Sequence, residues 1–178
     1  GVDSGLPDFR GNQGFWSAYP PFAKAGLSFQ EIADPIWFDR DPELAWGFYG
    51  HRLRLYRETT PQPGFAILRD WAETRPGGAF VFTSNVDGQF QKAGFEDKQI
   101  VECHGSIHHL QCHRPCSFTL WNAPETEVAV DQTTFRASLP LPCCPYCGQT
   151  ARPNVLMFWD GQWISQRSKA QKEQLEDW

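Results

Sequence analysis

The sequence has no long run of apolar residues and no excess of positive charge. Its longest apolar run, residues 155–159, predicts a buried strand at most, since a membrane-spanning helix needs roughly 18 to 20 such residues. The 16 lysines and arginines are outnumbered by 21 aspartates and glutamates, which gives a formal net charge of −5. Nucleic-acid binders usually present a basic face. We therefore expect no nucleic-acid contact, no membrane association, and a small molecule or another protein as the partner.

The sequence also lacks internal repeats, low-complexity segments and an initial methionine. The 178 residues are 40% hydrophobic and include eight Trp and fourteen Phe, which is typical of a packed globular protein. This length supports one substantial core with at most a small satellite module. We expect a cytoplasmic protein.

Helices are predicted by their caps and by the spacing of apolar residues. Asp41 and Pro42 suit the N-cap and first position of a helix through residue 58, and residues 62–73 predict a second. Residues 1–40 combine turn signals with aromatics, which favours a long structured loop with short helical pieces. Residues 164–178 predict a charged amphipathic helix.

Three short apolar segments predict strands at residues 79–83, 100–102 and 107–112. The first has the composition of a strand buried on both faces. Polar residues follow the first two, in SNVDG (84–88) and CHGS (103–106). Strand, polar tip, helix and strand is the order of an α/β fold, whose ligands bind at the carboxyl ends of parallel strands. His108 and His109 are consecutive in the third strand, so we expect them to face opposite ways.

Four cysteines have the spacing of a zinc site. Cys144 and Cys147 form a C-x2-C knuckle, and Cys112 and Cys116 form a C-x3-C pair. Four thiolates leave no open coordination position, so the zinc would be structural. Disulfides, Cys143 in place of Cys144, and His113 in place of a cysteine are the alternatives. The cysteines delimit a predicted zinc module of residues 110–152, between a first part of residues 1–109 and a final part of residues 153–178.

Polar residues at the strand ends are the candidate site. His104 is a candidate general base near neutral pH, whereas His51, on a predicted helix, reads as structural. Asn85 and Asp87 suit recognition of a carboxamide, or only cap turns. Asp8 and Arg10 flank Phe9 in a glycine-rich segment. This arrangement makes all three candidate site residues; the alternative is that Asp8 and Arg10 only form a surface ion pair.

Four segments in this order, GVDSGLPDFRG, TSNVDGQFQKAG, HGS and the cysteine pairs followed by RPNVLMF, resemble the sirtuins. The resemblance covers about residues 1–160. It implies an incomplete Rossmann-like parallel sheet that binds NAD, a small inserted zinc-binding module with one zinc per chain, and a strand and phosphate-binding turn before Gly1. The implied activity is NAD-dependent deacylation of an acylated lysine in a protein or peptide, with transfer of the acyl group to ADP-ribose and release of nicotinamide.

The resemblance also implies residue roles. His104 matches the catalytic base, and Asn85 is assigned to catalysis with it. The implied cofactor-binding residues are Gly1, Asp8, Phe9, Arg10, Ser84, Asn85, Asp87 and His104, and the zinc ligands are Cys112, Cys116, Cys144 and Cys147.

Two positions depart from the family pattern. The family usually has Gln at the position of Ser84, and Gly at that of Trp159, where the acyl-peptide pairs as an added strand. These departures favour, as the alternative, a sirtuin-like NAD hydrolase or ADP-ribosyltransferase. A non-enzymatic NAD-binding module is the third possibility.

Overall fold

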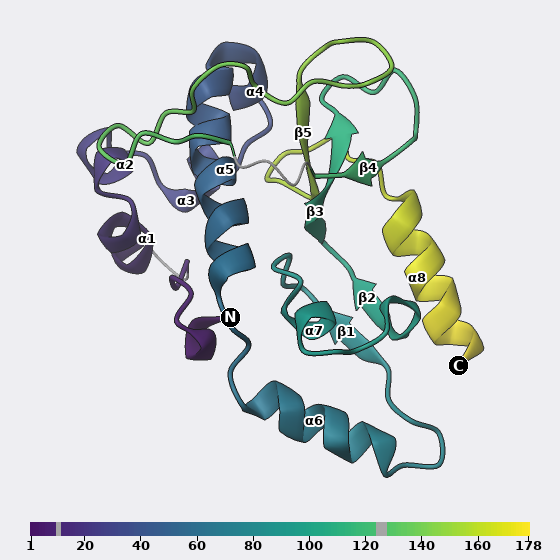
Figure 1. Ribbon diagram of the computed structural model, residues 1–178. Helices are drawn as coiled ribbons and strands as arrows, with labels where there is room; N and C mark the ends of the chain where they lie inside the picture. The colour runs from purple at the N-terminus through teal and green to yellow at the C-terminus, as the bar shows by residue number, and fades with distance from the viewer. Residues whose placement is uncertain (10–11, 124–127) are drawn as a thin grey trace.

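The computed structural model describes residues 1–9, 12–123 and 128–178 (Figure 1). Within them, no helix combines the length and apolar character needed to cross a membrane. The strands form two sheets, a parallel pair β1–β2 and an antiparallel sheet in the order β4-β3-β5. The predicted α/β class with a parallel sheet is confirmed, and the division of the chain into three parts stays a prediction.

The helices are α1 (Asn12–Ala18), α2 (Pro20–Lys24), α3 (Phe29–Ile32), α4 (Trp37–Arg40), α5 (Pro42–Glu58), α6 (Gly64–Glu73), α7 (Gln89–Lys92) and α8 (Gln166–Asp177), with 3₁₀ turns at Val2–Ser4 and Asp97–Gln99. The strands are β1 (Val81–Thr83), β2 (Ile100–Glu102), β3 (Gly105–Cys112), β4 (Trp121–Asn122) and β5 (Ala151–Val155).

The parallel pair is shorter and less covered than the sequence predicts. β1 and β2 pair in register from Val81 with Ile100 to Thr83 with Glu102, and α7 lies in the connection between them. β2 is buried, but Phe82 in β1 is 61% exposed. The prediction of a strand at residues 79–83 buried on both faces is therefore wrong. Alternate residues point to opposite faces, and the described residues cover only one face of β1.

The third predicted strand belongs to the antiparallel sheet. Ser106 and Leu110 of β3 pair with adjacent residues of β5, so the three residues between them form a bulge. His108 and His109 lie in this bulge, and both line one cavity. A bulge interrupts the alternation of a strand and re-aims its side chains, so the rule behind the expected opposite orientation does not apply here, and that orientation stays a prediction.

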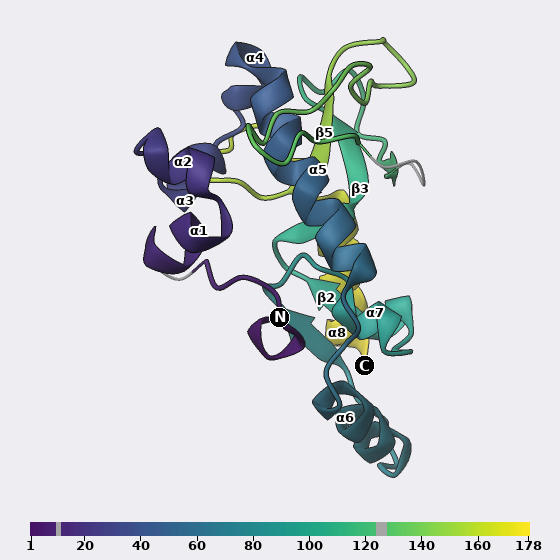
Figure 2. The same ribbon diagram turned by 60° about the vertical axis from the view of Figure 1, so that its left-hand side comes forward.

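The long helix α5 lies between the N-terminal helices and the β3–β5 sheet (Figures 1 and 2). The predicted cap is confirmed: the Leu44 N–H donates to Asp41 Oδ1 at 3.1 Å, and Pro42 is the first helical residue. On the other face, the Trp46 indole N–H donates to the Ala151 carbonyl at 2.9 Å. This bond joins the helix to β5, so the core forms on both sides of α5.

The described part of residues 1–40 forms short helical pieces, as predicted, and its aromatic rings cover one another. Phe15, Tyr19 and Phe22 are fully buried, and the rings of Phe15 and Phe22 stack with centroids 5.9 Å apart. The Trp16 indole N–H donates to the Leu27 carbonyl at 2.7 Å. These rings therefore belong to the core.

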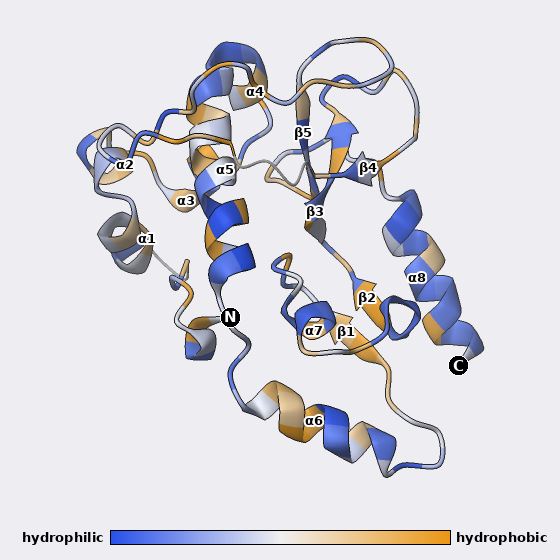
Figure 3. Cartoon of the chain, in the orientation of Figure 1, coloured by the Kyte–Doolittle hydropathy of each residue, from blue (hydrophilic) through white to orange (hydrophobic). Residues whose placement is uncertain are grey.

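The predicted C-terminal helix is present as α8, but its buried face is polar rather than apolar. The Ser168 hydroxyl donates to the Glu102 carbonyl at 2.8 Å, and the Glu102 N–H donates to Gln171 Oε1 at 3.0 Å. Figure 3 shows this hydrophilic helix beside the hydrophobic β2. α8 therefore satisfies backbone groups of β2 that would otherwise be buried without a partner.

Candidate functional site

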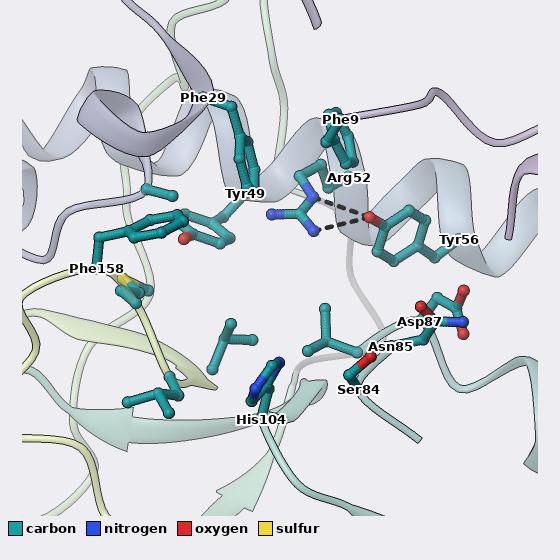
Figure 4. A pocket seen from close by; sticks show the side chains of 15 residues that line it. Phe9, Phe29, Tyr49, Arg52, Tyr56, Ser84, Asn85, Asp87, His104 and Phe158 are labelled. Carbon is teal, nitrogen blue, oxygen red and sulfur yellow. Dashed lines mark hydrogen bonds between the residues drawn. The ribbon is translucent and has the colours of Figure 1, made fainter. Parts of the chain in front are cut away.

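A cavity of about 500 Å³ opens where β1 and β2 end (Figure 4). Its walls come from the two strand ends, from α5, from the segment after β5, and from the N-terminal region. It brings together five of the predicted site residues, Phe9, Ser84, Asn85, Asp87 and His104. The other lining residues are Phe29, Ala33, Tyr49, Arg52, Tyr56, Val86, Val155, Leu156, Met157 and Phe158.

The turn after β1 presents Ser84, Asn85 and Asp87 to the cavity. The Asn85 N–H donates to Thr83 Oγ1 at 3.0 Å, and buried Asp87 accepts the Gln89 N–H on Oδ1 at 3.1 Å. Asp87 therefore caps the turn, as one of the two interpretations predicts, and it also lines the cavity. A Cβ added to Gly1 would lie 3.5 Å from Asp87 Oδ2, which places Gly1 beside this carboxylate.

His104 occupies the turn between β2 and β3, with an exposed imidazole at the cavity (Figure 4). Its carbonyl accepts the Leu156 N–H at 2.9 Å. Gly105 has φ +78°, and a Cβ there would lie 2.0 Å from the Asn154 carbonyl oxygen. Only glycine fits this turn, so the HGS sequence fixes the backbone that carries the imidazole.

Phe9 forms the wall on the N-terminal side. Its ring stacks on Phe29 with centroids 5.0 Å apart, and the guanidinium carbon of Arg52 lies 4.9 Å from the centroid of Phe9. Asp8 is exposed and is not among the residues that line the cavity. Arg10 lies outside the described residues. Of the predicted DFR segment, the structure therefore places Phe9 at the site.

Arg52 is a cavity residue that sequence reasoning missed. It is 5% exposed, and its Nε and Nη2 donate to the Tyr56 hydroxyl at 3.0 and 2.8 Å. No carboxylate among the described residues pairs with this guanidinium, which is surrounded by aromatic rings. The neighbouring Tyr49 hydroxyl is buried and has no described hydrogen-bond partner. Burial raises the pKa of Tyr49 to about 12. A charged donor and a neutral phenol thus face the same cavity.

A signal for Arg52 was present in the helical pattern. Ala45, Phe48, Tyr49 and Tyr56 are among the buried residues of α5, and Arg52 continues their i+3 and i+4 spacing. A permanent cation at a core position needs compensation or a ligand.

The segment after β5 contains the departure at Trp159. Of the apolar run 155–159, only Val155 is in a strand. Trp159 has φ +56° and is 72% exposed, and Phe158 beside it lines the cavity. Trp159 thus adopts the left-handed backbone that glycine favours, and its ring points outward rather than filling the space over β5.

Four of the six cysteines surround one point. The sulfur atoms of Cys112 and Cys147 lie 3.7 Å apart, those of Cys116 and Cys144 lie 3.6 Å apart, and all four are within 4.8 Å of one another. A disulfide needs about 2.05 Å, whereas four sulfurs at ~2.3 Å from one zinc would be ~3.8 Å apart. The four residues therefore fit a closed tetrahedral zinc site.

The C-x2-C knuckle favours the thiolate form of Cys144, and the alternative ligands Cys143 and His113 do not join the cluster. Burial opposes ionisation of Cys144, but N–H groups of Tyr146 and Cys147 bond to its sulfur, and its pKa is lowered to about 7. Cys143 is exposed, and its thiol donates to a backbone carbonyl at 3.3 Å. His113 Nε2 lies 3.1 Å from a carboxylate of α4.

Comparison with known sequences gives the same family throughout. The Sir2 family model matches residues 1–177. The chain is 35% identical over 159 residues to an NAD-dependent protein deacylase of Pyrococcus furiosus, covering 88% of this chain and 56% of that protein. It is 31% identical over 171 residues to an NAD-dependent protein deacylase of Aquifex aeolicus, covering 95% and 62%. The chain thus spans little more than half the length of these relatives.

Solved structures agree with the sequence matches. A Sir2 homologue mutant in complex with ADP-ribose matches with a TM-score of 0.68 and 28% identity, over 89% of this chain and 55% of that one. A Sir2 homologue in complex with NAD matches with a TM-score of 0.67 and 27% identity, over 88% and 53%. The chain belongs to the Sir2 family, the sirtuins.

Proposed function

We propose that this protein is an NAD-dependent protein lysine deacylase, which transfers an acyl group from a lysine side chain to ADP-ribose and releases nicotinamide. The observation that carries the proposal is the cavity that unites Phe9, Asn85, Asp87 and His104 in a Sir2-family chain. The relatives named above are deacylases, and the matching structures hold NAD or ADP-ribose.

The strand-end residues would hold the cofactor. The Asn85 amide and the Asp87 carboxylate suit the carboxamide and hydroxyl groups of NAD, and Gly1 leaves room beside Asp87. Phe9 would cover the nicotinamide side against water. Ser84 is shorter than the family's usual Gln, so it reaches the ribose only through different contacts or a bridging water. Asp8 and Arg10 stay predicted cofactor contacts.

His104 would act as the base. NAD, when bound, supplies a glycosidic bond from which nicotinamide can leave. An imidazole accepts a proton near neutral pH, so His104 would take a proton from a ribose hydroxyl and make that oxygen nucleophilic toward the acyl carbon. Asn85, on the adjacent strand end, would orient the reacting groups.

The inner wall of the cavity favours an acyl chain that ends in a carboxylate. Arg52 is buried, and its described hydrogen bonds go only to the Tyr56 hydroxyl. A carboxylate would supply the missing counter-charge, and the Tyr49 hydroxyl would donate a second bond to it. A plain acetyl group would leave this cation without an anionic partner. We therefore propose short dicarboxylic acyl groups, such as succinyl, as the preferred substrates.

Zinc would have a structural role. The four thiolates fill a tetrahedral site, so the ion would hold residues 110–152 in place, with one zinc per chain.

We also propose a cytoplasmic location, because reduced thiols and a zinc cluster suit a reducing compartment. Fluorescence microscopy of a tagged protein tests the location.

Nicotinamide release tests the activity. The purified protein is incubated with NAD and either acetyl-lysine or succinyl-lysine peptide, and both nicotinamide and free lysine are quantified. We expect release that depends on peptide, is faster with succinyl-lysine and is abolished by His104→Ala. Release that does not depend on peptide would favour the NAD hydrolase or ADP-ribosyltransferase instead.

Arg52→Met tests the acyl preference. Losing a charged hydrogen bond of about 1.5–3 kcal/mol should lower kcat/KM for the succinyl peptide roughly 10- to 160-fold. The acetyl peptide is the matched control, since it makes no such bond. Equal losses for the two peptides would refute the preference.

A further inference from the structure

A second cavity, of about 400 Å³, lies on the other side of the turn that carries Asp87. Asp87 and Tyr56 line both cavities. The second cavity is also lined by His108 and His109 from the bulge in β3 and by Arg167 from α8. The turn of residues 84–88 is therefore a wall between two cavities, with one face toward the candidate site and the other toward β3.

His108 bonds to this turn from the far side. Its Nε2 lies 3.0 Å from the Asp87 carbonyl oxygen. A carbonyl only accepts hydrogen bonds, so the Nε2 atom carries the proton and donates it. Burial lowers the pKa of His108, an effect that its bond to Asp87 partly offsets. The ring is therefore neutral near pH 7, with its proton held on Nε2 by the carbonyl.

The ring of His108 also packs against the next residue of the turn. Gly88 has φ +69°, and a Cβ there would lie 2.8 Å from both Cδ2 and Nε2 of His108. The backbone beside the ring is further held by the Ile107 N–H, which donates to the Val86 carbonyl at 3.0 Å. Three consecutive residues of the turn, 86–88, thus contact two consecutive residues of β3.

The bulge makes this arrangement possible. In a regular strand, the side chain at position 108 would alternate with its neighbours and stay in register with β5. The register shift between Ser106 and Leu110 frees residues 107–109 from β5. Bulges beside functional sites commonly re-aim one side chain, and here the side chain is His108.

We propose that His108 is a positioning residue, whose Nε2–H holds the 84–88 turn so that Asn85 and Asp87 face the cofactor cavity. This inference rests on the proposed function, because it assigns the held residues to NAD. Losing a bond to a buried carbonyl should weaken NAD binding roughly 5- to 30-fold. The change should appear in the KM and Kd for NAD and leave the KM for the acyl-peptide unchanged, because Arg52, Tyr49 and Phe158 are on other walls.

Two substitutions of His108 test the bond itself. The terminal amide nitrogen of glutamine can occupy the place of Nε2 and donate to the same carbonyl, whereas asparagine is too short to reach it. With the full chain, His108→Gln should bind NAD within about threefold of the unchanged protein, and His108→Asn should show the full loss. His109→Asn is the matched control, since His109 lies in the same bulge and cavity but has no described bond to the turn.

NAD affinity is measured by calorimetry and the kinetic constants by nicotinamide release, with thermal melting to compare folding. If the unchanged protein lacks deacylase activity but the Gln and Asn variants still differ in NAD affinity, the proposed activity fails and the positioning role stands. Equal NAD affinities for the Gln and Asn variants would overturn the inference. Equal losses in His108→Asn and His109→Asn would also overturn it, because they would indicate general packing damage.

Discussion

The buried ion pair between Arg152 and Asp160 gives the sharpest test of what holds the segment after β5. Nη1 and Nη2 of Arg152 donate to the two carboxylate oxygens at 2.7 and 2.9 Å, and both side chains are 0% exposed. Asp160→Asn keeps the shape but leaves a buried guanidinium without a counter-charge. Removing one partner of such a pair costs about 3–5 kcal/mol. The amide oxygen can still accept the Gln162 N–H, which Asp160 accepts at 3.0 Å, so we expect the lower end, about 3 kcal/mol.

Urea unfolding followed by circular dichroism measures this loss. Glu176→Gln is the matched control, because it makes the same acid-to-amide change in the exposed pair with Lys172, which should contribute only about 0.3–0.5 kcal/mol. The double variant Arg152→Met, Asp160→Leu replaces both charges with apolar groups. It should recover most of the stability lost in Asp160→Asn, because the main cost is the unpaired charge.

Two results would refute this reasoning. A loss below about 1 kcal/mol in Asp160→Asn, indistinguishable from Glu176→Gln, would mean that water or another group compensates the guanidinium. A double variant less stable than the single one would mean that the pair stabilises the fold more than apolar packing does.

Removing the metal with a chelator should unfold residues 110–152, which hydrogen exchange would detect; unchanged protection in metal-free protein would contradict the zinc site. Trp159→Gly should raise the free energy of unfolding by about 1 kcal/mol, because a bulky residue at φ +56° is strained; an unchanged melting temperature would count against strain. Burial lowers the pKa of His109 from 6.5 to about 4. The unfolded chain therefore binds this proton first as the pH falls, so stability should decrease from pH 6.5 toward pH 4, and His109→Gln should reduce that slope in melts across this range.

The sequence predicts those features of this protein that depend on local patterns. The cap at Asp41, the paired cysteines and the polar tips after β1 and β2 each follow from a few neighbouring residues, and each is where the pattern places it. The bulge at His108 depends on pairing with β5, more than forty residues later, so no local rule reveals it. Likewise, the exposure of Phe82 depends on which other elements pack on the two faces of the β1–β2 sheet, and the apolar composition of the strand does not reveal this.

Arg52 shows why the site is the hardest part to predict. Its helical position assigns it to the core, where it lies, but its charge assigns it to the surface, so the two local rules contradict each other. The conflict itself is informative, because local and global preferences disagree mainly at functional positions. An arginine on an apolar helix face is therefore a marker of a candidate ligand site.

The opposite charges on the cavity walls also constrain how two substrates could share it. Arg52 lies on α5, while the Asp87 carboxylate lies beside Asn85 on the turn after β1 (Figure 4). An anionic acyl end is attracted by the first group and repelled by the second. It must therefore lie along the wall of Arg52 and Tyr49, which leaves the wall of Asn85 and Asp87 to the uncharged carboxamide. Under the proposed function, charge alone thus assigns each substrate its side of the cavity, before any shape complementarity is considered.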